Sequence, residues 1–388
     1  MSLSLRPVSP AISLVGVTGG KAFMERQYVL RGIDHFSKEK SEEFWRRKQN
    51  HQLSLLIIGI STTRACNYRC NYCYSARSRA AGQKLTLEEQ KEIIDQAAEL
   101  GAKTVLICGD GEPSLDRDLV GIVEHSHKRE LYCVIVTNAN ALGNDKVAQA
   151  VYGMSAGEFT AFLWEHGTSL MIKMDSLEEN KYEEIVGVLG SYPQFRKACD
   201  NVFEAGFGQT AVQAHGRLVT RVTFVTVVAK LNFFEPSLLR EFAHQHNAQY
   251  ICKFPSFLGN AKSNSKLFFP PWEEATVWLR ENYVRKMSDK PETFTTDGIH
   301  CGAWHYGAVV GDSGDIRLCY SATCPDNYVI GNIREKPLAK LLRKREEMFK
   351  ELLMRGQSCY IKGVQYQSAA DITPDKQRMI KQYFGHIL

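Results

Sequence analysis

The fold and the chemistry of this chain are decided by one stretch, Ser61-Thr62-Thr63-Arg64-Ala65-Cys66-Asn67-Tyr68-Arg69-Cys70-Asn71-Tyr72-Cys73-Tyr74. It contains three cysteines spaced C-x3-C-x2-C and directly follows an apolar run, 53–60, which we predict to be a buried strand. A loop this short brings three thiolates to one metal centre, whereas a closed zinc or iron-sulfur site needs four ligands. One coordination position therefore remains open to a substrate or cofactor, as is typical of a metal site that does chemistry.

The charges beside these cysteines favour metal binding. We expect Arg64 and Arg69 to place positive charge next to the thiolates and so to favour their ionised form, which is the form that binds metal. A structural zinc knuckle, completed by a distant cysteine or histidine, is the alternative interpretation. Zinc sites usually come as two paired units of the C-x2-C or H-x3-H kind, and this pattern favours the open site instead.

The cysteine spacing, with Tyr72 just before the last cysteine, resembles the cluster-binding loop of the radical S-adenosylmethionine (radical SAM) superfamily. In that family the three cysteines hold a 4Fe-4S cluster, and S-adenosylmethionine chelates the fourth iron through its amino and carboxylate groups. The resemblance implies that Cys66, Cys70 and Cys73 are both metal ligands and catalytic residues, and that Tyr72 lies in the cofactor site. It also implies reductive cleavage of S-adenosylmethionine to methionine and a 5′-deoxyadenosyl radical.

The composition is that of a globular protein in a reducing compartment. The chain has 388 residues, 44% hydrophobic and 23% charged, and no apolar run reaches the roughly 18 residues that cross a bilayer. The N-terminus lacks an unbroken apolar signal-peptide core, and eleven cysteines suit metal ligation better than a disulfide framework, so we expect a cytoplasmic protein. A net charge of +5 spread along the chain argues against nucleic acid as a partner, and we expect no membrane partner either.

Short apolar runs alternate with helical segments through the middle of the chain. We predict six strands, at 53–60, 104–108, 131–137, 170–174, 218–228 and 250–254. Thr86 and Ser155 each open a capping box at the start of an intervening helix. This alternation predicts an α/β fold with a parallel sheet. The superfamily resemblance implies a partial (β/α)6 barrel over residues 53–265, preceded by an N-terminal extension, residues 1–52.

A glycine-rich turn follows the second predicted strand. Its sequence, Gly109-Asp110-Gly111-Glu112-Pro113, resembles the superfamily's Gly-Gly-Glu-Pro element, whose backbone binds the methionine amino group of the cofactor. Here Asp110 separates the two glycines. Gly109 and Gly111 permit a close backbone approach that a side chain would block. The resemblance makes the glycines, Glu112 and Pro113 candidate cofactor-binding residues, and a plain loop is the alternative.

Three further strand ends supply candidate cofactor-binding residues. Asn138 ends the third strand in a turn that resembles the family's Thr-Asn-Gly. Asp175 and Ser176 follow the fourth strand, where the resemblance implies contact with the cofactor ribose or the substrate, and Lys173 is either a substrate-facing cation or a solvated strand end. Arg221, in the fifth strand, is a candidate partner of the cofactor carboxylate, unless strand alternation turns it outward.

A second set of cysteines lies later in the chain, at Cys301, Cys319, Cys324 and Cys359. The run 309–318 predicts a β-hairpin that returns Cys319 towards Cys301. The spacing C-x12-Gly-x4-C resembles the auxiliary-cluster region called SPASM, or Twitch in its shortened form. The resemblance implies a SPASM/Twitch-like domain over residues 290–388, in which Cys301, Cys319 and Cys324 bind one auxiliary 4Fe-4S cluster. Either Cys359 is the fourth ligand, or the fourth iron is open to the substrate. A structural zinc site is the alternative.

These resemblances imply an enzyme of the oxidoreductase or lyase type. We expect it to abstract hydrogen from a small-molecule substrate, a sugar, aminocyclitol or nucleoside of natural-product biosynthesis, in a dehydrogenation, epimerisation, deamination or decarboxylation. A reductant such as flavodoxin or ferredoxin supplies the electron. Radical modification of a ribosomally synthesised peptide, by thioether or carbon-carbon bond formation or by epimerisation, is the alternative enzymatic hypothesis, as is activation of another protein. A non-catalytic zinc- or RNA-binding module is the alternative from another class.

Overall fold

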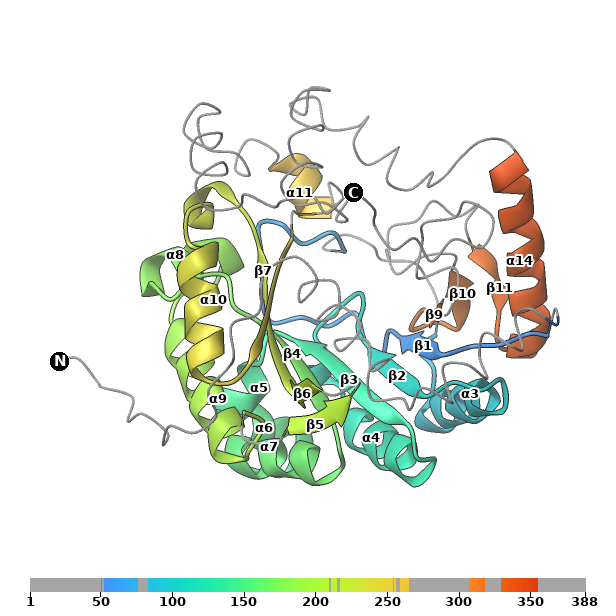
Figure 1. The fold of residues 1–388 in the computed structure, drawn as a ribbon, viewed down its shortest axis with the longest axis horizontal. Helices are drawn as coiled ribbons and strands as arrows, with labels where there is room; N and C mark the ends of the chain where they lie inside the picture. Colours follow the sequence, from blue (N-terminus) through green and yellow to red (C-terminus); the bar gives the residue numbers. More distant parts are fainter. Residues whose placement is uncertain are drawn as a thin grey trace.

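The computed structural model describes residues 50, 52–75, 83–208, 211–214, 217–253, 255, 259–264, 307–317 and 329–354. Within them, nine strands form one sheet in the order β11-β10-β9-β1-β2-β3-β4-β7-β8 (Figure 1). The strands of this sheet are β1 (Ile57–Ile60), β2 (Thr104–Ile107), β3 (Tyr132–Thr137), β4 (Ser169–Lys173), β7 (Val222–Val227), β8 (Gln249–Lys253), β9 (Gly307–Val310), β10 (Asp315–Arg317) and β11 (Val329–Asn332). A separate hairpin pairs β5 (Ala211–Ala214) with β6 (Arg217–Thr220).

Strands β1, β2, β3, β4, β7 and β8 pair in parallel, and helices connect them along the outer face of the sheet (Figure 1). The helices are α3 (Leu87–Glu99), α4 (Leu119–Lys128), α5 (Asn140–Gly143), α6 (Asp145–Tyr152), α7 (Ala156–Glu165), α8 (Glu179–Val186), α9 (Tyr192–Glu204), α10 (Pro236–Gln245), α11 (Gly259–Ser263) and α14 (Leu338–Met354). Edge strands β8 and β11 leave the described sheet open, as in a partial barrel. The predicted α/β fold class is confirmed.

The fifth predicted strand is wrong in its extent. The apolar run 218–228 is broken at Arg221 into β6 and β7. Strand β6 turns back onto β5, whereas β7 pairs with β4 and β8 in the main sheet. A continuous run of β-forming residues does not reveal such a break, because both halves have the same local preference.

Both predicted capping boxes are present. At the start of α3, Thr86 Oγ1 accepts the Glu89 N–H at 3.2 Å, and the Glu89 carboxylate accepts the Thr86 N–H at 2.8 Å. At the start of α7, Ser155 and Glu158 make the same reciprocal pair at 3.2 and 2.7 Å. Each box satisfies two backbone donors that the helix itself leaves without partners, and this fixes where the helix begins.

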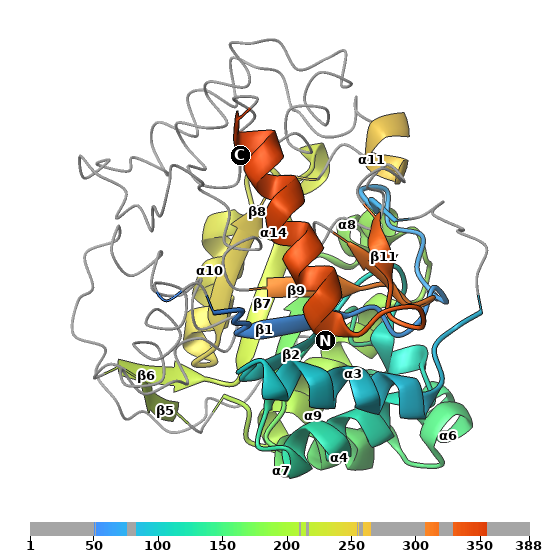
Figure 2. The same ribbon diagram turned by 90° about the vertical axis from the view of Figure 1, so that its right-hand side faces the viewer.

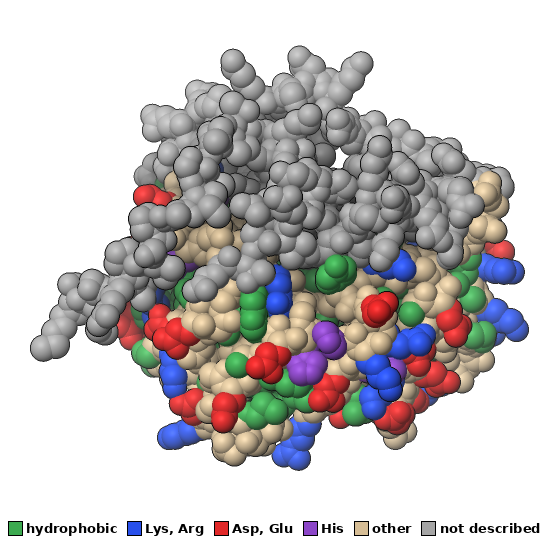
Figure 3. All heavy atoms as spheres, turned by 60° about the horizontal axis from the view of Figure 1, so that its bottom comes forward, with side chains coloured by type: hydrophobic (Ala, Val, Ile, Leu, Met, Phe, Trp, Pro, Cys, Tyr) green, Lys and Arg blue, Asp and Glu red, His purple; other side chains and the backbone are tan. Residues whose placement is uncertain are grey.

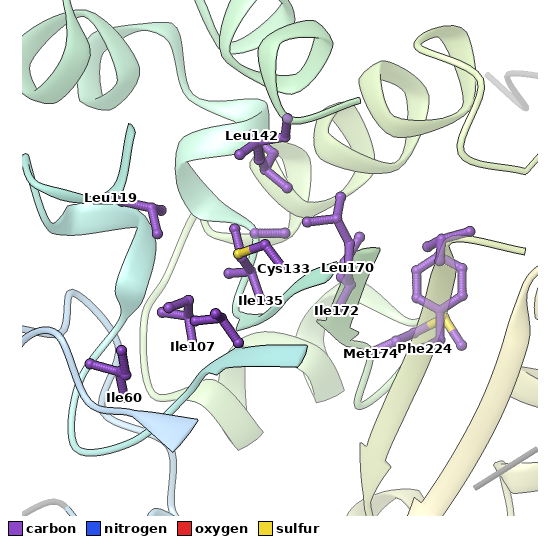
Figure 4. Packing of buried hydrophobic residues seen from close by; sticks show 14 of the residues in the cluster. Ile60, Ile107, Leu119, Cys133, Ile135, Leu142, Leu170, Ile172, Met174 and Phe224 are labelled. Atoms are coloured by element: carbon purple, nitrogen blue, oxygen red, sulfur yellow. The ribbon is translucent and has the colours of Figure 1, made fainter. Parts of the chain in front are cut away.

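Alternate residues of the parallel strands form a core with the helices. Figure 4 shows Ile107, Ile135, Leu170 and Ile172 from neighbouring strands packed together, and each is no more than 1% exposed. A fully buried side chain of this kind contributes about 2 kcal/mol to stability. Of the other described cysteines, Cys133, Cys199 and Cys252 are buried, and Cys108 is partly exposed.

The segment after residue 306 joins the main sheet instead of building a sheet of its own. Strand β9 pairs in parallel with β1, and β9, β10 and β11 pair antiparallel in turn. The predicted hairpin is therefore confirmed, with Gly314 in its turn at a φ of 91°. Helix α14 lies alongside β9 and β11 (Figure 2), and its Leu338 N–H donates to Gln96 Oε1 of α3 at 2.8 Å.

Some predicted features lie outside the described residues. They are most of the N-terminal extension, residues 1–52, and the candidate ligands Cys301, Cys319, Cys324 and Cys359. Within the described ranges, no helix is long and apolar enough to span a membrane. Lys and Arg side chains intermingle with Asp and Glu on the face that Figure 3 presents, which agrees with the even spread of charge along the sequence.

Candidate functional site

The candidate site lies where the carboxyl ends of β1, β2, β3 and β4 meet. Residues 61–75, called here the cysteine loop, follow β1, and Gly109–Pro113, called the strand-two turn, follow β2. Asn138 follows β3, and Asp175 and Ser176 follow β4. Parallel pairing brings these four segments to one edge of the sheet, which is where α/β folds carry their functional groups.

The end of α8 holds the middle of the cysteine loop. The carbonyl oxygens of Val186 and Ile185 accept the backbone N–H groups of Arg69 and Asn71, both at 3.0 Å. Gly187 follows with a φ of 69°, and a Cβ there would lie 2.8 Å from the Arg69 carbonyl oxygen. The left-handed glycine therefore both ends α8 and admits the loop.

Helix α11 holds the other side of the same loop. The Asn260 backbone N–H donates to the Cys73 carbonyl at 2.8 Å, and its side-chain amide donates to the Cys70 carbonyl at 3.0 Å. Asn264 adds a bond to the Asn71 carbonyl at 3.1 Å. The sequence did not reveal these residues, because nothing in the pattern of α11 marks it as a neighbour of a loop about 190 positions earlier.

The three cysteines of this loop fit an iron-sulfur cluster. Cys66 is exposed, Cys70 and Cys73 are partly exposed, and the three thiols lie near enough to influence one another's ionisation. Within the described residues, no three Cys, His, Asp or Glu side chains converge as ligands of a single ion. A cluster makes no such demand, because each of its thiolates binds a different iron. The loop therefore offers one thiol to each of three irons of a cluster.

The expected electrostatic help from Arg64 is wrong. Its guanidinium donates to Asp312 Oδ1 from Nε at 2.8 Å and from Nη2 at 2.5 Å, so its charge is paired with the hairpin turn. Partial desolvation raises the pKa of the Cys66 thiol to about 11. Burial likewise raises the pKa of Cys70. Among the described residues, no cation lowers the pKa of either thiol, so the expected help from positive charge is absent at Cys66 and Cys70.

The glycines of the strand-two turn make room for the cysteine loop. A Cβ at Gly111 would overlap the Ala65 carbonyl oxygen and lie 2.7 Å from the carbonyl carbon of Arg64. A Cβ at Gly109, whose φ is 138°, would lie 2.5 Å from Ser61 Oγ. The Glu112 N–H then donates to the Ala65 carbonyl at 2.8 Å. The sequence correctly indicated a close backbone approach, and the neighbour that the structure places there is the cysteine loop.

Glu112 stabilises the strand-two turn through hydrogen bonds that its carboxylate accepts. Its carboxylate is 3% exposed and accepts four hydrogen bonds, from Ser114 N at 3.0 Å, Ser114 Oγ at 2.7 Å, Thr137 Oγ1 at 2.5 Å and Asn138 N at 2.7 Å. Burial raises the pKa of this carboxyl group, and the hydrogen bonds oppose that rise. Pro113 begins the short 3-10 turn Pro113–Leu115. The Glu112 side chain thus joins the ends of β2 and β3, and the expected cofactor contacts of Glu112 and Pro113 stay predictions.

Asn138 links the end of β3 to the cysteine loop. Its side-chain amide donates to Asn67 Oδ1 at 2.9 Å, and its own Oδ1 accepts the Asn140 N–H at 2.9 Å. Ala139, where the family usually has glycine, adopts a left-handed φ of 63°. The left-handed conformation that favours glycine is therefore adopted here by alanine.

Tyr72 and Asp175 form a buried pair under Lys173. The Tyr72 hydroxyl donates to Asp175 Oδ2, and the Val227 N–H donates to Asp175 Oδ1 at 2.9 Å. The Lys173 ammonium lies 3.4 Å from Asp175 Oδ1 and 4.9 Å from the centre of the Tyr72 ring. Burial raises the pKa of Tyr72, so the hydroxyl keeps its proton as a donor. Lys173 is the more exposed member, with 17% of its side chain accessible, and we expect it to face substrate or cofactor.

Ser176 and Arg221 serve other contacts. Ser176 Oγ donates to Glu235 Oε2 at 2.7 Å, and its expected role at the ribose stays a prediction. Arg221 lies at the amino end of β7, opposite the candidate site, where its guanidinium donates to the carbonyls of Thr168 and Trp164 at 2.7 and 2.8 Å. Burial there lowers the pKa of Arg221 to about 10. Arg221 therefore does not belong to the site, which corrects the sequence-based expectation.

Replacing Gly111 by alanine tests the contact between the turn and the cysteine loop. Because the new Cβ meets backbone atoms that cannot rotate away, we expect Gly111→Ala to lower the free energy of unfolding by about 1–3 kcal/mol. Gly157, in α7, is the matched control, since a Cβ at this position would meet only open space. Gly157→Ala is expected to stabilise the protein by about 0.5–1 kcal/mol, as in other helices. Thermal unfolding measures both, and equal effects of the two variants would contradict the contact.

Comparison with known proteins finds similarity over the part of the chain that carries this site. Residues 60–222 match the model of the family described as Radical SAM superfamily. The GTP 3′,8-cyclase of Tolumonas auensis is 31% identical over 156 residues, which are 39% of this chain and 43% of that protein. The GTP 3′,8-cyclase of Aeromonas hydrophila is 31% identical over 165 residues, 40% of this chain and 44% of that protein. The chain thus spans less than half the length of these curated relatives.

Solved structures resemble more of the chain. Streptococcus suis SuiB bound to S-adenosylmethionine superposes with a TM-score of 0.56 at 15% identity, over 83% of this chain and 76% of SuiB. The complex of SuiB with the precursor peptide SuiA gives 0.54 at 16% identity, over 88% and 73%. The protein anSMEcpe with bound AdoMet gives 0.52 at 14% identity, over 85% and 96%. At these identities the likeness shows the fold.

Proposed function

We propose, on the premise that residues 60–222 form a radical SAM domain, that this chain is an enzyme that cleaves S-adenosylmethionine reductively. It then uses the 5′-deoxyadenosyl radical to abstract a hydrogen atom from a substrate. The single observation that carries the proposal is the contact of the cysteine loop with the strand-two turn, which places three thiols beside a glycine-rich backbone at the carboxyl ends of β1 and β2.

We assign a separate role to the cysteines, to the strand-two turn and to Lys173. Cys66, Cys70 and Cys73 hold a 4Fe-4S cluster, which when bound supplies the electron for cofactor cleavage. The backbone of the strand-two turn receives the methionine amino group. Lys173, held over Tyr72 and beside Asp175, supplies a cation to an anionic part of the cofactor or substrate.

The substrate class we propose is a sugar, aminocyclitol or nucleoside. Two observations support it: the sequence similarity to GTP 3′,8-cyclases, whose name specifies a nucleotide, and the partly exposed ammonium of Lys173, which suits an anionic group. The hydrogen abstraction then ends in dehydrogenation, epimerisation, deamination or decarboxylation. We further propose that Cys301, Cys319, Cys324 and Cys359 bind an auxiliary 4Fe-4S cluster, and that flavodoxin or ferredoxin is the reductant.

Peptide modification is the second candidate function. The observation in its favour is the fold match to SuiB, which has been solved with a precursor peptide and which covers 88% of this chain. Product analysis with nucleoside and peptide substrates separates the two candidates, since each substrate class gives products of its own mass.

Cofactor cleavage tests the proposed function. Anaerobically reconstituted protein, mixed with S-adenosylmethionine and dithionite, is expected to form 5′-deoxyadenosine and methionine. Cys73→Ala is expected to form none, because the cluster loses a ligand. Cys199→Ala, which removes a buried thiol from α9, is the matched control and is expected to retain formation. Absence of 5′-deoxyadenosine from fully iron-loaded wild-type protein would refute the proposal.

A further inference from the structure

A buried ion pair joins the hairpin of β9 and β10, called here the C-terminal hairpin, to the middle of the strand-two turn. Arg317, the last residue of β10, places Nη1 3.1 Å from Asp110 Oδ2 and 3.4 Å from Oδ1. Arg317 is 6% exposed and Asp110 is 7% exposed. The guanidinium lies against Gly311, where a Cβ would come within 2.6 Å of Nη2. Because Gly311 has no side chain, the Arg317 guanidinium can pass beside it and reach the strand-two turn.

Asp110 also contacts both ends of the cysteine loop. Its backbone N–H donates to Ser61 Oγ at 3.2 Å, and the Ser61 hydroxyl lies 3.4 Å from Asp110 Oδ2. Its carbonyl accepts a hydrogen bond from Ser75 Oγ at 3.0 Å. One residue of the turn is therefore tied to the start of the loop, to its end, and through Arg317 to a strand 207 positions away.

The charge of Asp110 makes the turn depend on Arg317. A carboxylate removed from water is strongly unfavourable unless it is paired and hydrogen-bonded. The Gly-Gly-Glu-Pro element that the turn resembles has no side chain between its glycines and needs no such partner. In this chain, the carboxylate between the two glycines is buried, and Arg317 of the hairpin is its charged partner.

We propose that Asp110 and Arg317 are positioning residues of the cofactor site. Their ion pair fixes the backbone of the strand-two turn in the conformation that receives the methionine end of S-adenosylmethionine, so that the C-terminal hairpin is part of that site. The inference rests on the proposed function, because it takes the turn to be the cofactor-binding segment.

A second ion pair provides a matched control. Arg64 and Asp312 connect the same hairpin to the cysteine loop at 2.5 Å, and the Arg64 side chain is 21% exposed. Asp312→Asn therefore weakens the attachment of the hairpin without removing a charge from the strand-two turn. If Asp110 acted only by anchoring the hairpin, Asp312→Asn and Asp110→Asn would have the same effect on cofactor binding.

The experiment measures the dissociation constant of S-adenosylmethionine by equilibrium dialysis on the full-length, cluster-reconstituted protein. Asp110→Asn and Arg317→Met are each expected to raise it by about tenfold or more, as expected when one partner of a buried charge pair is removed. Arg317→Lys keeps the charge and is expected to retain part of the affinity. Asp312→Asn is expected to raise the constant less than Asp110→Asn does, because the Arg64 side chain is 21% exposed and reaches water, whereas Arg317 is 6% exposed.

Thermal unfolding of the double variant Asp110→Asn/Arg317→Met separates positioning from stability. With both charges gone no buried charge is left unpaired, so its unfolding temperature is expected to exceed that of either single variant. Its dissociation constant for S-adenosylmethionine is nevertheless expected to stay about tenfold raised, because the turn has lost its charge-assisted contact. This variant carries the test should a single variant fail to fold.

The outcomes distinguish the inference from the proposed function. Wild-type protein that carries its cluster but does not bind S-adenosylmethionine would refute the proposed function, and the inference with it. Wild-type protein that binds, together with unchanged affinity in Asp110→Asn or in the double variant, would overturn the inference alone. A loss of affinity in Asp312→Asn equal to that in Asp110→Asn would also overturn it.

Discussion

Replacing Cys66, Cys70 and Cys73 together by alanine is expected to remove about four irons and four sulfides from the anaerobically reconstituted protein. The three thiols belong to one loop that is held on both sides, by the end of α8 and by α11, so the loop keeps its path when the cluster is absent. If the later cysteines bind an auxiliary cluster, the wild-type protein contains about eight irons and the variant about four. Iron and sulfide analysis, with Mössbauer spectra to identify the cluster type, measures the change.

Cys199→Ala and the metal content itself provide the controls for this prediction. Cys199 is buried in α9 and is no candidate ligand, so its variant is expected to retain the full iron content. A fall from about four irons in the wild type to none in the variant would show one cluster, bound by these three cysteines. It would refute the auxiliary cluster. Zinc in place of iron, or unchanged iron in the triple variant, would contradict the assignment of these cysteines to a 4Fe-4S cluster.

Glu112→Ala is expected to lower the free energy of unfolding by about 3 kcal/mol or more. The substitution leaves the backbone N–H groups of Ser114 and Asn138 and the hydroxyls of Ser114 and Thr137 without their common acceptor in a buried environment. It also separates the strand-two turn from the end of β3, so affinity for S-adenosylmethionine is expected to fall with stability. Chemical denaturation followed by circular dichroism measures the free energy.

Two variants serve as controls for the Glu112→Ala prediction. Glu112→Gln keeps one carbonyl oxygen for the three donors that meet Oε1 and loses only the contact to Asn138, so it is expected to cost about 1–2 kcal/mol. Glu124→Ala, at an exposed position of α4, is expected to change stability by less than about 0.5 kcal/mol. Equal stability of Glu112→Ala and wild type would show that the described hydrogen-bond network does not form.

Local features of the sequence predicted much of this fold. Apolar runs marked the strands, and Thr86 and Ser155 marked helix starts, because capping depends only on residues three apart. Arg221 was misplaced because a strand break moved it to the amino end of β7, and the alternating pattern carries no sign of that break. The prediction of charge beside the cysteines failed for Arg64, since its partner Asp312 lies 248 positions away.

The candidate site was predicted from short motifs, whereas the long-range contacts that hold it in place were not predicted. The cysteine spacing and the glycine turn are local patterns, so their proximity followed once the strands were taken as parallel neighbours. The Asn260 amide and the Arg317 guanidinium act across more than 180 positions, and single residues of common types carry no signal of such pairing. Asp110 needs a partner because its carboxylate is buried, and only the structure shows that burial.

The parallel pairing of β9 with β1 governs the order of events during synthesis. A ribosome completes β1 and the cysteine loop long before it reaches Gly307, so the nascent chain exposes one unpaired edge of β1 through most of translation. Over the same period Asp312, the partner of Arg64, and Arg317, the partner of Asp110, have not yet been synthesised. The contacts of the hairpin with the cysteine loop and the strand-two turn therefore form last, after α8 and α11 already hold the loop. Until Gly307 emerges, the unpaired edge of β1 is open to pairing with another chain.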